Sequence, residues 1–119
     1  MDDGGTVRRI RFGFTDAEPI AQFESRGVAG VHVAAGNGAA QIYALHFEAG
    51  GEIGPHPAGF DQLFLVVAGD GWLAGADGRR HELKAGEGAV VKKGEVHSKG
   101  GRSVMTAIMI QVDRLESVQ

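Results

Sequence analysis

Glycine divides this sequence into short apolar runs. The chain has 20 glycines among 119 residues, and they stand between the runs rather than in tracts. Hydrophobic residues make up 43% of the chain, whereas a disordered segment carries few of them. Short apolar runs joined by glycine turns are typical of β-sandwiches and β-barrels. The pattern therefore predicts an all-β protein with few or no helices.

The expected strands follow from apolar–polar alternation or from continuous apolar runs. They cover residues 7–12, 28–34, 40–48, 63–68, 72–74, 80–83, 89–91 and 104–112. A turn is expected at residues 36–38, and Asp77-Gly78 predicts a hairpin. Residues 63–68 are apolar at every position, so we expect a central strand that is covered on both faces.

Length and composition narrow the class of protein. A chain of 119 residues predicts one domain, with a barrel at residues 5–114 and tails at 1–4 and 115–119. It has no cysteine, so disulfides and thiolate metal ligands are excluded. No segment reaches the ~18 apolar residues of a membrane span, which predicts a cytoplasmic protein with no membrane partner. A net charge of −3 gives no basic face, so nucleic acid is not an expected partner.

Two glycine-framed motifs carry the candidate chemistry. In the first, Gly50 is followed after five residues by His56, and Ala58 comes two positions later. Three residues after Ala58 stands Gln62, and six residues after Gln62 stands Gly69. Glycines at such positions suit tight strand connections with positive φ.

In the second motif, Gly86 is followed after five residues by Lys92-Lys93-Gly94. Two residues further on comes His97, and three residues after it comes Gly101. The motifs are separated by 16 residues, 70–85. We expect positive φ at Gly86 and Gly94 as well as at the glycines of the first motif.

The two motifs together resemble those of the cupin superfamily, and all the spacings match. The family has a second histidine where this chain has Ala58, a glutamate where it has Gln62, and an asparagine where it has Gly101. The resemblance implies a double-stranded β-helix, or jelly-roll barrel, of two sheets. Its site lies inside the mouth, and small members are often homodimers.

The resemblance also implies metal ligands at His56, Gln62 and His97, and His46 on the preceding strand is a further candidate. Two neutral imidazoles and an amide leave the charge of a divalent ion uncompensated, so affinity should fall below that of the full motif. The sequence leaves two alternatives open, one divalent ion (Zn, Mn, Fe or Ni) and a metal-free site.

Strand alternation defines the expected pocket. Gln62, Phe64 and Val66 share one face, and the latter two would form an apolar floor. A buried Gln62 needs a hydrogen-bond partner, for which either histidine is suitable. Asp61 would point the opposite way, to the surface. Further pocket-lining candidates are Phe60, Tyr43 and Trp72, the last either at the mouth or in the core. Tyr43 and His46 lie on opposite faces of one strand, and the sequence does not decide which of the two faces the interior.

Three functions fit these residues. The first is a small-molecule-binding barrel with a degenerate metal site, which we favour. The second is a metal-dependent enzyme such as a dioxygenase or isomerase, and the third a metal-free epimerase or isomerase that uses histidine as acid or base. We expect a homodimer formed through the strand at residues 7–12, which carries Ile10 and Phe12, unless that strand closes its own barrel.

Overall fold

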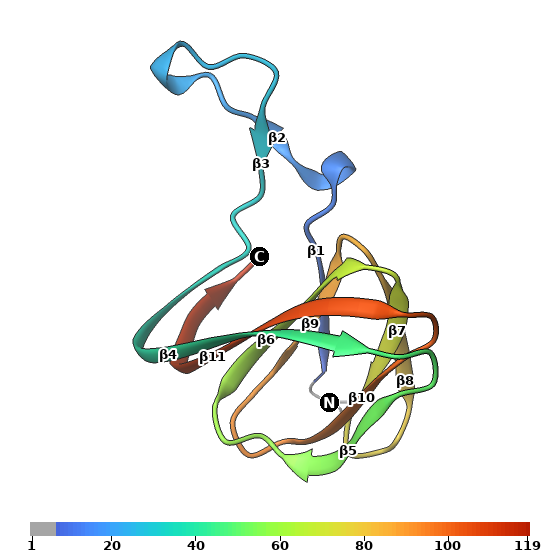
Figure 1. Ribbon diagram of the computed structural model, residues 1–119. Helices are drawn as coiled ribbons and strands as arrows, with labels where there is room; N and C mark the ends of the chain where they lie inside the picture. Colours follow the sequence, from blue (N-terminus) through green and yellow to red (C-terminus); the bar gives the residue numbers. More distant parts are fainter. Residues whose placement is uncertain (1–6) are drawn as a thin grey trace.

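The computed structural model describes residues 7–119, and its barrel consists of two packed antiparallel sheets (Figure 1). The five-stranded sheet has the order β1 (Arg8–Arg11), β9 (Glu87–Val91), β6 (Asp61–Ala68), β11 (Met105–Val118) and β4 (Ala34–Phe47). The four-stranded sheet has the order β5 (Glu52–Pro57), β10 (Val96–Gly101), β7 (Asp70–Ala74) and β8 (Arg80–Lys84). The prediction of an all-β, two-sheet fold is confirmed.

The central strand β6 shows how the sequence produces the layers. Phe64 and Val66 are 1% and 0% exposed and belong to the core between the two sheets. Leu63, on the opposite face, is 5% exposed and belongs to a second core with Val90 and Ile10. Side chains on a strand alternate between its faces, so a continuous apolar run supplies both cores. The prediction of cover on both faces therefore holds at Leu63, whereas Val67 on the same outer face is 46% exposed.

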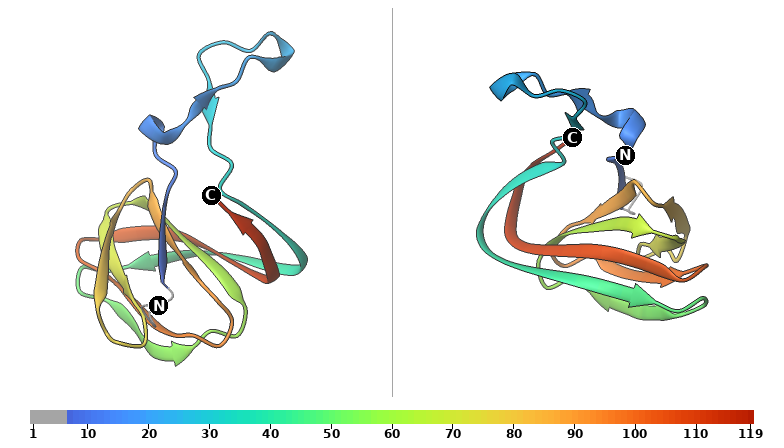
Figure 2. Two further views of the ribbon diagram at one scale, coloured as in Figure 1. Left: turned by 180° about the vertical axis from the view of Figure 1, so that it is seen from behind. Right: turned by 45° about the horizontal axis from the view of Figure 1, so that its top comes forward.

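The second core is covered by an overhang. The paired ends of β4 and β11 bend away from the sheet (Figure 2), with register shifts after Val112 and after Leu115. β-Bulges of this kind bend a strand and strengthen its twist. Leu115 is consequently 8% exposed and packs in the second core.

Glycine turns close the strands as the motifs predict. Gly50, Gly69, Gly86 and Gly94 have φ values of 83°, 75°, 90° and 89°. At Gly69 the chain also passes very close to its neighbour, because an added Cβ would lie 2.1 Å from the carbonyl oxygen of Val104. A side chain at this position would therefore force the backbone to move, and the expectation of positive φ at all four glycines is confirmed.

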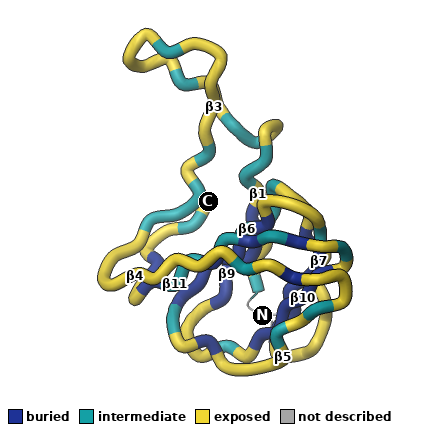
Figure 3. The backbone as a smooth tube through the Cα atoms, viewed as in Figure 1, coloured by how far each residue is buried: buried dark blue, intermediate teal, exposed yellow. Residues whose placement is uncertain are grey.

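Residues 13–33 form an arm that projects from the barrel (Figures 1 and 2). It contains two 3₁₀ turns, Phe14–Asp16 and Gln22–Glu24, and a small hairpin of β2 (Glu18–Pro19) and β3 (Ala29–Gly30). No residue of the arm is buried (Figure 3). Phe14 and Phe23 are 93% and 94% exposed.

Four of the bounds predicted from the sequence differ from those in the structure. The strand expected at residues 28–34 is reduced to Ala29–Gly30, because this part lies in the arm. No turn interrupts residues 36–38, since β4 runs through them and pairs with β11. Residues 115–118 are part of β11 rather than a tail, and the arm lies outside the barrel that was expected to fill 5–114. The tail expected at residues 1–4 lies outside the described residues.

The N-terminal strand joins its own barrel. β1 pairs with β9 at the edge of the five-stranded sheet, and Ile10 is only 2% exposed. The amide of Arg11 donates to the side-chain oxygen of Gln119 at 2.9 Å. Of the two alternatives for this strand, the structure has the one in which it closes its own sheet, so Ile10 is not available to a second chain.

Candidate functional site

The two motif histidines lie side by side at one end of the barrel. His56 on β5 pairs in register with His97 on β10, and their ring centroids are 4.5 Å apart. His97 is 0% exposed, whereas His56 is exposed and its Nδ1 lies 2.8 Å from the carbonyl oxygen of Gly54. The structure therefore brings together one buried and one accessible imidazole.

Gln62 lies near the start of β6, on the face that carries Phe64 and Val66, and is 3% exposed. Its Oε1 has no hydrogen-bond partner among residues 7–119, and neither ring nitrogen of His97 has one. The hydrogen bond that the sequence suggests between Gln62 and a motif histidine is thus not formed. Three buried polar atoms at this end of the barrel therefore have no hydrogen-bond partner. In native proteins, buried polar atoms are normally hydrogen-bonded.

A buried lysine completes the interior, and sequence reasoning missed it. Lys99 follows His97 by two residues on β10 and is 2% exposed. Its Nζ lies 3.6 Å from Sδ of Met109 and 5.1 Å from the ring centroid of Phe64, both on the opposite sheet. The alternation His97–x–Lys99 was the available signal, since residues two apart on a strand share a face.

Burial and charge shift the titration of both groups. Desolvation lowers the pKa of Lys99 to about 8. Desolvation, followed by the positive charges of Lys99 and His56, lowers the pKa of His97 to about 4. At pH 7 the interior therefore holds a protonated lysine and a neutral His97.

The nearest carboxylate along β6 does not face this interior. Asp61 accepts hydrogen bonds at 2.9 Å from the backbone amides of Lys93 and Leu115, and forms an ion pair with Lys92 at 3.7 Å. Burial alone would raise the pKa of Asp61, but these hydrogen bonds and the Lys92 charge lower it. Asp61 points opposite to Gln62 as expected, yet it is 7% exposed rather than a surface residue, because the overhang covers it.

Two of the remaining candidates, His46 and Trp72, lie on the outer faces of the sheets. His46 is exposed, and its Nδ1 lies 3.1 Å from Oγ1 of Thr106 on the outer face, so it is not a ligand. Trp72 packs on the outer face of the four-stranded sheet beside Gly100, with the Arg80 guanidinium 3.8 Å from its ring centroid. Trp72 therefore lies neither at the mouth nor in the core between the sheets, the two positions that the sequence left open.

Tyr43 occupies the interior-facing side of β4, level with Met109, and is 42% exposed. Its hydroxyl donates to Oε1 of Gln41 at 2.6 Å. Gln41, Gln111 and Gln62 stand in register across β4, β11 and β6. This glutamine row, which the sequence analysis did not identify, makes the same end of the barrel polar.

The predicted apolar floor is packed core. Phe64 meets Phe47 edge-on, with ring centroids 6.2 Å apart, and Val66 packs in the same cluster. Phe60 is half-buried in the connection between β5 and β6. Gln62, His97 and Lys99 lie at the same end of the interior and are 3%, 0% and 2% exposed.

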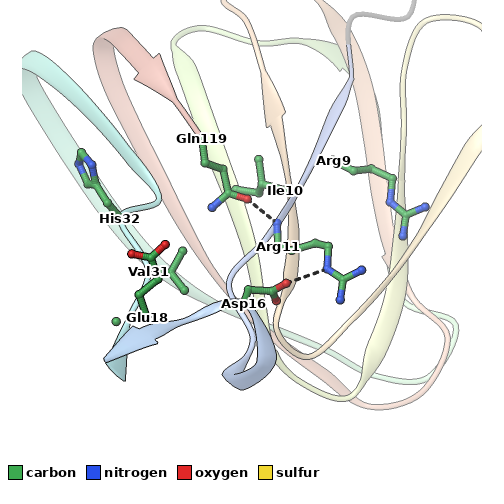
Figure 4. Close-up of a pocket in the computed structure, with 9 residues that line it drawn as sticks. Arg9, Ile10, Arg11, Asp16, Glu18, Val31, His32 and Gln119 are labelled. Carbon is green, nitrogen blue, oxygen red and sulfur yellow. Dashed lines mark hydrogen bonds and ion pairs between the residues drawn. The ribbon is translucent and has the colours of Figure 1, made fainter. Parts of the chain in front are cut away.

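Hollows lie outside this interior. One of about 310 Å³ lies between β4 and β5, lined by residues 45–48 and 51–53. A larger one, of about 550 Å³, lies between β1 and the arm and is lined by residues that include Arg9, Arg11, Asp16 and Glu18 (Figure 4). Two of these lining residues, Arg11 and Asp16, form an ion pair at 3.1 Å (Figure 4).

The donor set at the histidine end does not fit a resident divalent metal ion. His56, His97 and Gln62 supply only neutral donors, and Ala58, where the family has a second histidine, is 4% exposed in the core. Within residues 7–119, no three histidine or carboxylate side chains come together. The Lys99 ammonium adds a like charge that would repel a cation in the same interior.

Solved structures place the chain in a class of two-sheet β-barrels. It matches a cupin superfamily protein from Desulfitobacterium hafniense at 15% identity, over 89% of this chain and 76% of the other, with a TM-score of 0.58. It matches a cupin-2 domain-containing protein from Shewanella frigidimarina at 26% identity, over 68% of this chain and 78% of the other, with a TM-score of 0.55.

A third match is salicylate 1,2-dioxygenase from Pseudoaminobacter salicylatoxidans, at 19% identity and a TM-score of 0.55, over 60% of this chain and 21% of that enzyme. No protein-family profile matches the sequence, and no curated protein is significantly similar to it. The chain has the double-stranded β-helix fold of the cupin superfamily. Among residues 7–119, no helix has the length and hydropathy that crossing a bilayer requires.

Proposed function

We propose that this cupin barrel binds a small molecule at its histidine end, between His56, Gln62 and His97. The observation that carries the proposal is the set of three unpartnered buried atoms, Oε1 of Gln62 and both ring nitrogens of His97. Each such atom costs about 1–3 kcal/mol when left without a partner. A ligand with its own donors and acceptors would satisfy all three.

The site has an approach from solvent. His56 is exposed and lies against the buried His97, and Tyr43 is 42% exposed on the interior-facing side of the edge strand β4. A ligand would enter at this end, contact His56 first and reach His97 and Gln62 after these side chains move apart. Small rotamer changes of this kind are common at binding sites.

Binding is better supported than either enzymatic alternative. A metal-dependent dioxygenase or isomerase needs an ion that the neutral donors and Lys99 disfavour. A metal-free epimerase that resembles known cupin-like ones pairs its histidine with a carboxylate, but the carboxylate of Asp61 is engaged by Lys93, Leu115 and Lys92. His97 is neutral at pH 7, so it can donate one hydrogen bond and accept another.

The test is a side-chain NMR titration of isotopically labelled protein. Benzoate and benzamide serve as probes, and the Gln62 amide and the His97 ring are the reporters. We expect at least one probe to shift both reporters, and His97→Ala to abolish the shift at Gln62. Probes that shift only residues of the two surface hollows would contradict the proposal.

A further inference from the structure

Lys99 is a buried cation that reaches across the barrel. Its backbone lies in the four-stranded sheet, opposite Leu73 and Ile53, whereas its Nζ meets Met109 and Phe64 of the five-stranded sheet. The thioether of Met109 is a weak acceptor and can engage one of the three ammonium hydrogens. The Phe64 ring adds a cation–π contact, which compensates a buried charge only in part.

No carboxylate compensates this charge among residues 7–119. The ion pairs of that part of the chain join aspartates and glutamates to arginines or to Lys92, and none of them includes Lys99. Asp61, the acid nearest in sequence to Gln62, is engaged on the outer face. An unpaired buried charge is strongly unfavourable, so the interior is short of one negative charge.

The neighbouring polar groups are neutral. His97 can turn an N–H toward a ligand, and Gln62 offers an amide. Together with Lys99 they form a set with one positive charge and no negative one, inside a medium of low dielectric constant. Such a set stabilises an anion far more than a neutral molecule of the same shape.

We propose that the small molecule bound in the barrel is a carboxylate, anchored by a charge-assisted hydrogen bond from Nζ of Lys99. The inference rests on the proposed function and adds the chemical class of the ligand. A single cation matches the single charge of a carboxylate. A phosphate, with nearly two charges, is normally held by arginines or several backbone amides, which the described interior does not provide.

The test compares paired probes of graded size: formate, acetate and benzoate, each with its neutral amide. Binding is followed at the Gln62 and His97 resonances of the wild type, of Lys99→Met and of Lys84→Met, which removes an exposed lysine of β8 as a control. We expect at least one carboxylate to bind about tenfold or more tightly than its amide. Lys99→Met should remove that preference, and Lys84→Met should keep it.

Equal affinity for a carboxylate and its amide, or an undiminished preference in Lys99→Met, would overturn this inference and leave interior binding intact. The absence of any shift at Gln62 and His97 would overturn both proposals.

A second readout needs no ligand. Lys99→Met in ligand-free buffer should melt about 3 °C or more above the wild type, because it removes an uncompensated charge. A lower melting temperature would show that the fold itself uses the charge, and would overturn the inference.

Discussion

Phe64 and Phe23 are the same residue type in opposite surroundings. Phe64 lies between the sheets and is 1% exposed, and Phe23 stands on the arm at 94% exposure. The polar side chains show the reverse, because Lys99 and His97 are buried in the barrel, and the Lys99 ammonium lies over the Phe64 ring. Folded proteins usually bury apolar side chains and expose polar ones. The interior of the barrel and the surface of the arm are the two places where this chain departs from that rule. The comparison teaches that stability alone explains neither place, so each is a candidate for contact with another molecule.

The largest expected effect tests the comparison itself. Phe64→Ala should lower the free energy of unfolding by about 3–5 kcal/mol, because it removes a buried ring from a packed core. Phe23→Ala should change it by no more than about 0.5 kcal/mol. Urea unfolding followed by tryptophan fluorescence of Trp72 measures both. A large loss in Phe23→Ala would show that the arm is packed against the protein and break the comparison.

The buried lysine predicts a dependence of stability on pH. Its pKa is about 8 in the folded protein against an ordinary value of 10.5, so the unfolded chain binds the proton more tightly. The free energy of unfolding should therefore rise with pH between about 8 and 10.5, by at most about 3 kcal/mol. Lys99→Met should lack this rise. Parallel curves for the two proteins over this range would contradict the burial of a charged Lys99.

Substituting the side chains that could ligate or repel a metal ion should raise the affinity of the interior for a divalent cation. Gln62→Glu supplies the missing negative charge and should raise zinc affinity, and adding Lys99→Met removes the repelling cation. We expect the double variant to bind zinc about 100-fold more tightly than the wild type, a gain of about 2.7 kcal/mol. Calorimetric titration measures this gain, and His56→Ala in the double variant should abolish it. Equal affinities for wild type and double variant would show that Gln62 is not positioned as a ligand.

The smallest expected effect concerns the arm. A homodimer remains our prediction, and since β1 is occupied by β9, we now propose that Phe14 and Phe23 make the contact. Replacing both with serine should weaken the dimer about tenfold, because aromatic residues often dominate interfaces. Sedimentation equilibrium over micromolar concentrations measures the change. Val104→Ser, which alters an exposed apolar residue of the barrel, is the control, and a wild-type mass of one chain throughout would refute the dimer.

The sequence predicts the barrel well because glycines and alternation act locally. Positive φ at Gly50, Gly69, Gly86 and Gly94 follows from the motifs alone, and so do the inward side chains of Gln62 and Phe64 on β6. Local rules suffice where one face of a strand is clearly apolar.

The same rules fail where both faces look alike or where a contact is long-range. Ile42 and Ala44 place apolar residues on the outer face of β4 as well, so the sequence alone did not decide the outward position of His46. Leu115 is buried only because two register shifts bend β11 over the sheet. Lys99 escaped notice because lysine is rarely buried, and only its neighbours across the barrel show that it is.

The most direct measurement of the central claim, that the interior polar atoms serve a ligand rather than the fold, is the stability of His97→Leu without ligand. Leucine has a volume close to that of histidine and carries no unpartnered nitrogen. We predict that the free energy of unfolding rises by about 1–3 kcal/mol, while the NMR response of Gln62 to the probes disappears. A fall in the free energy of unfolding by a similar amount would show that His97 stabilises the barrel, and would contradict the account.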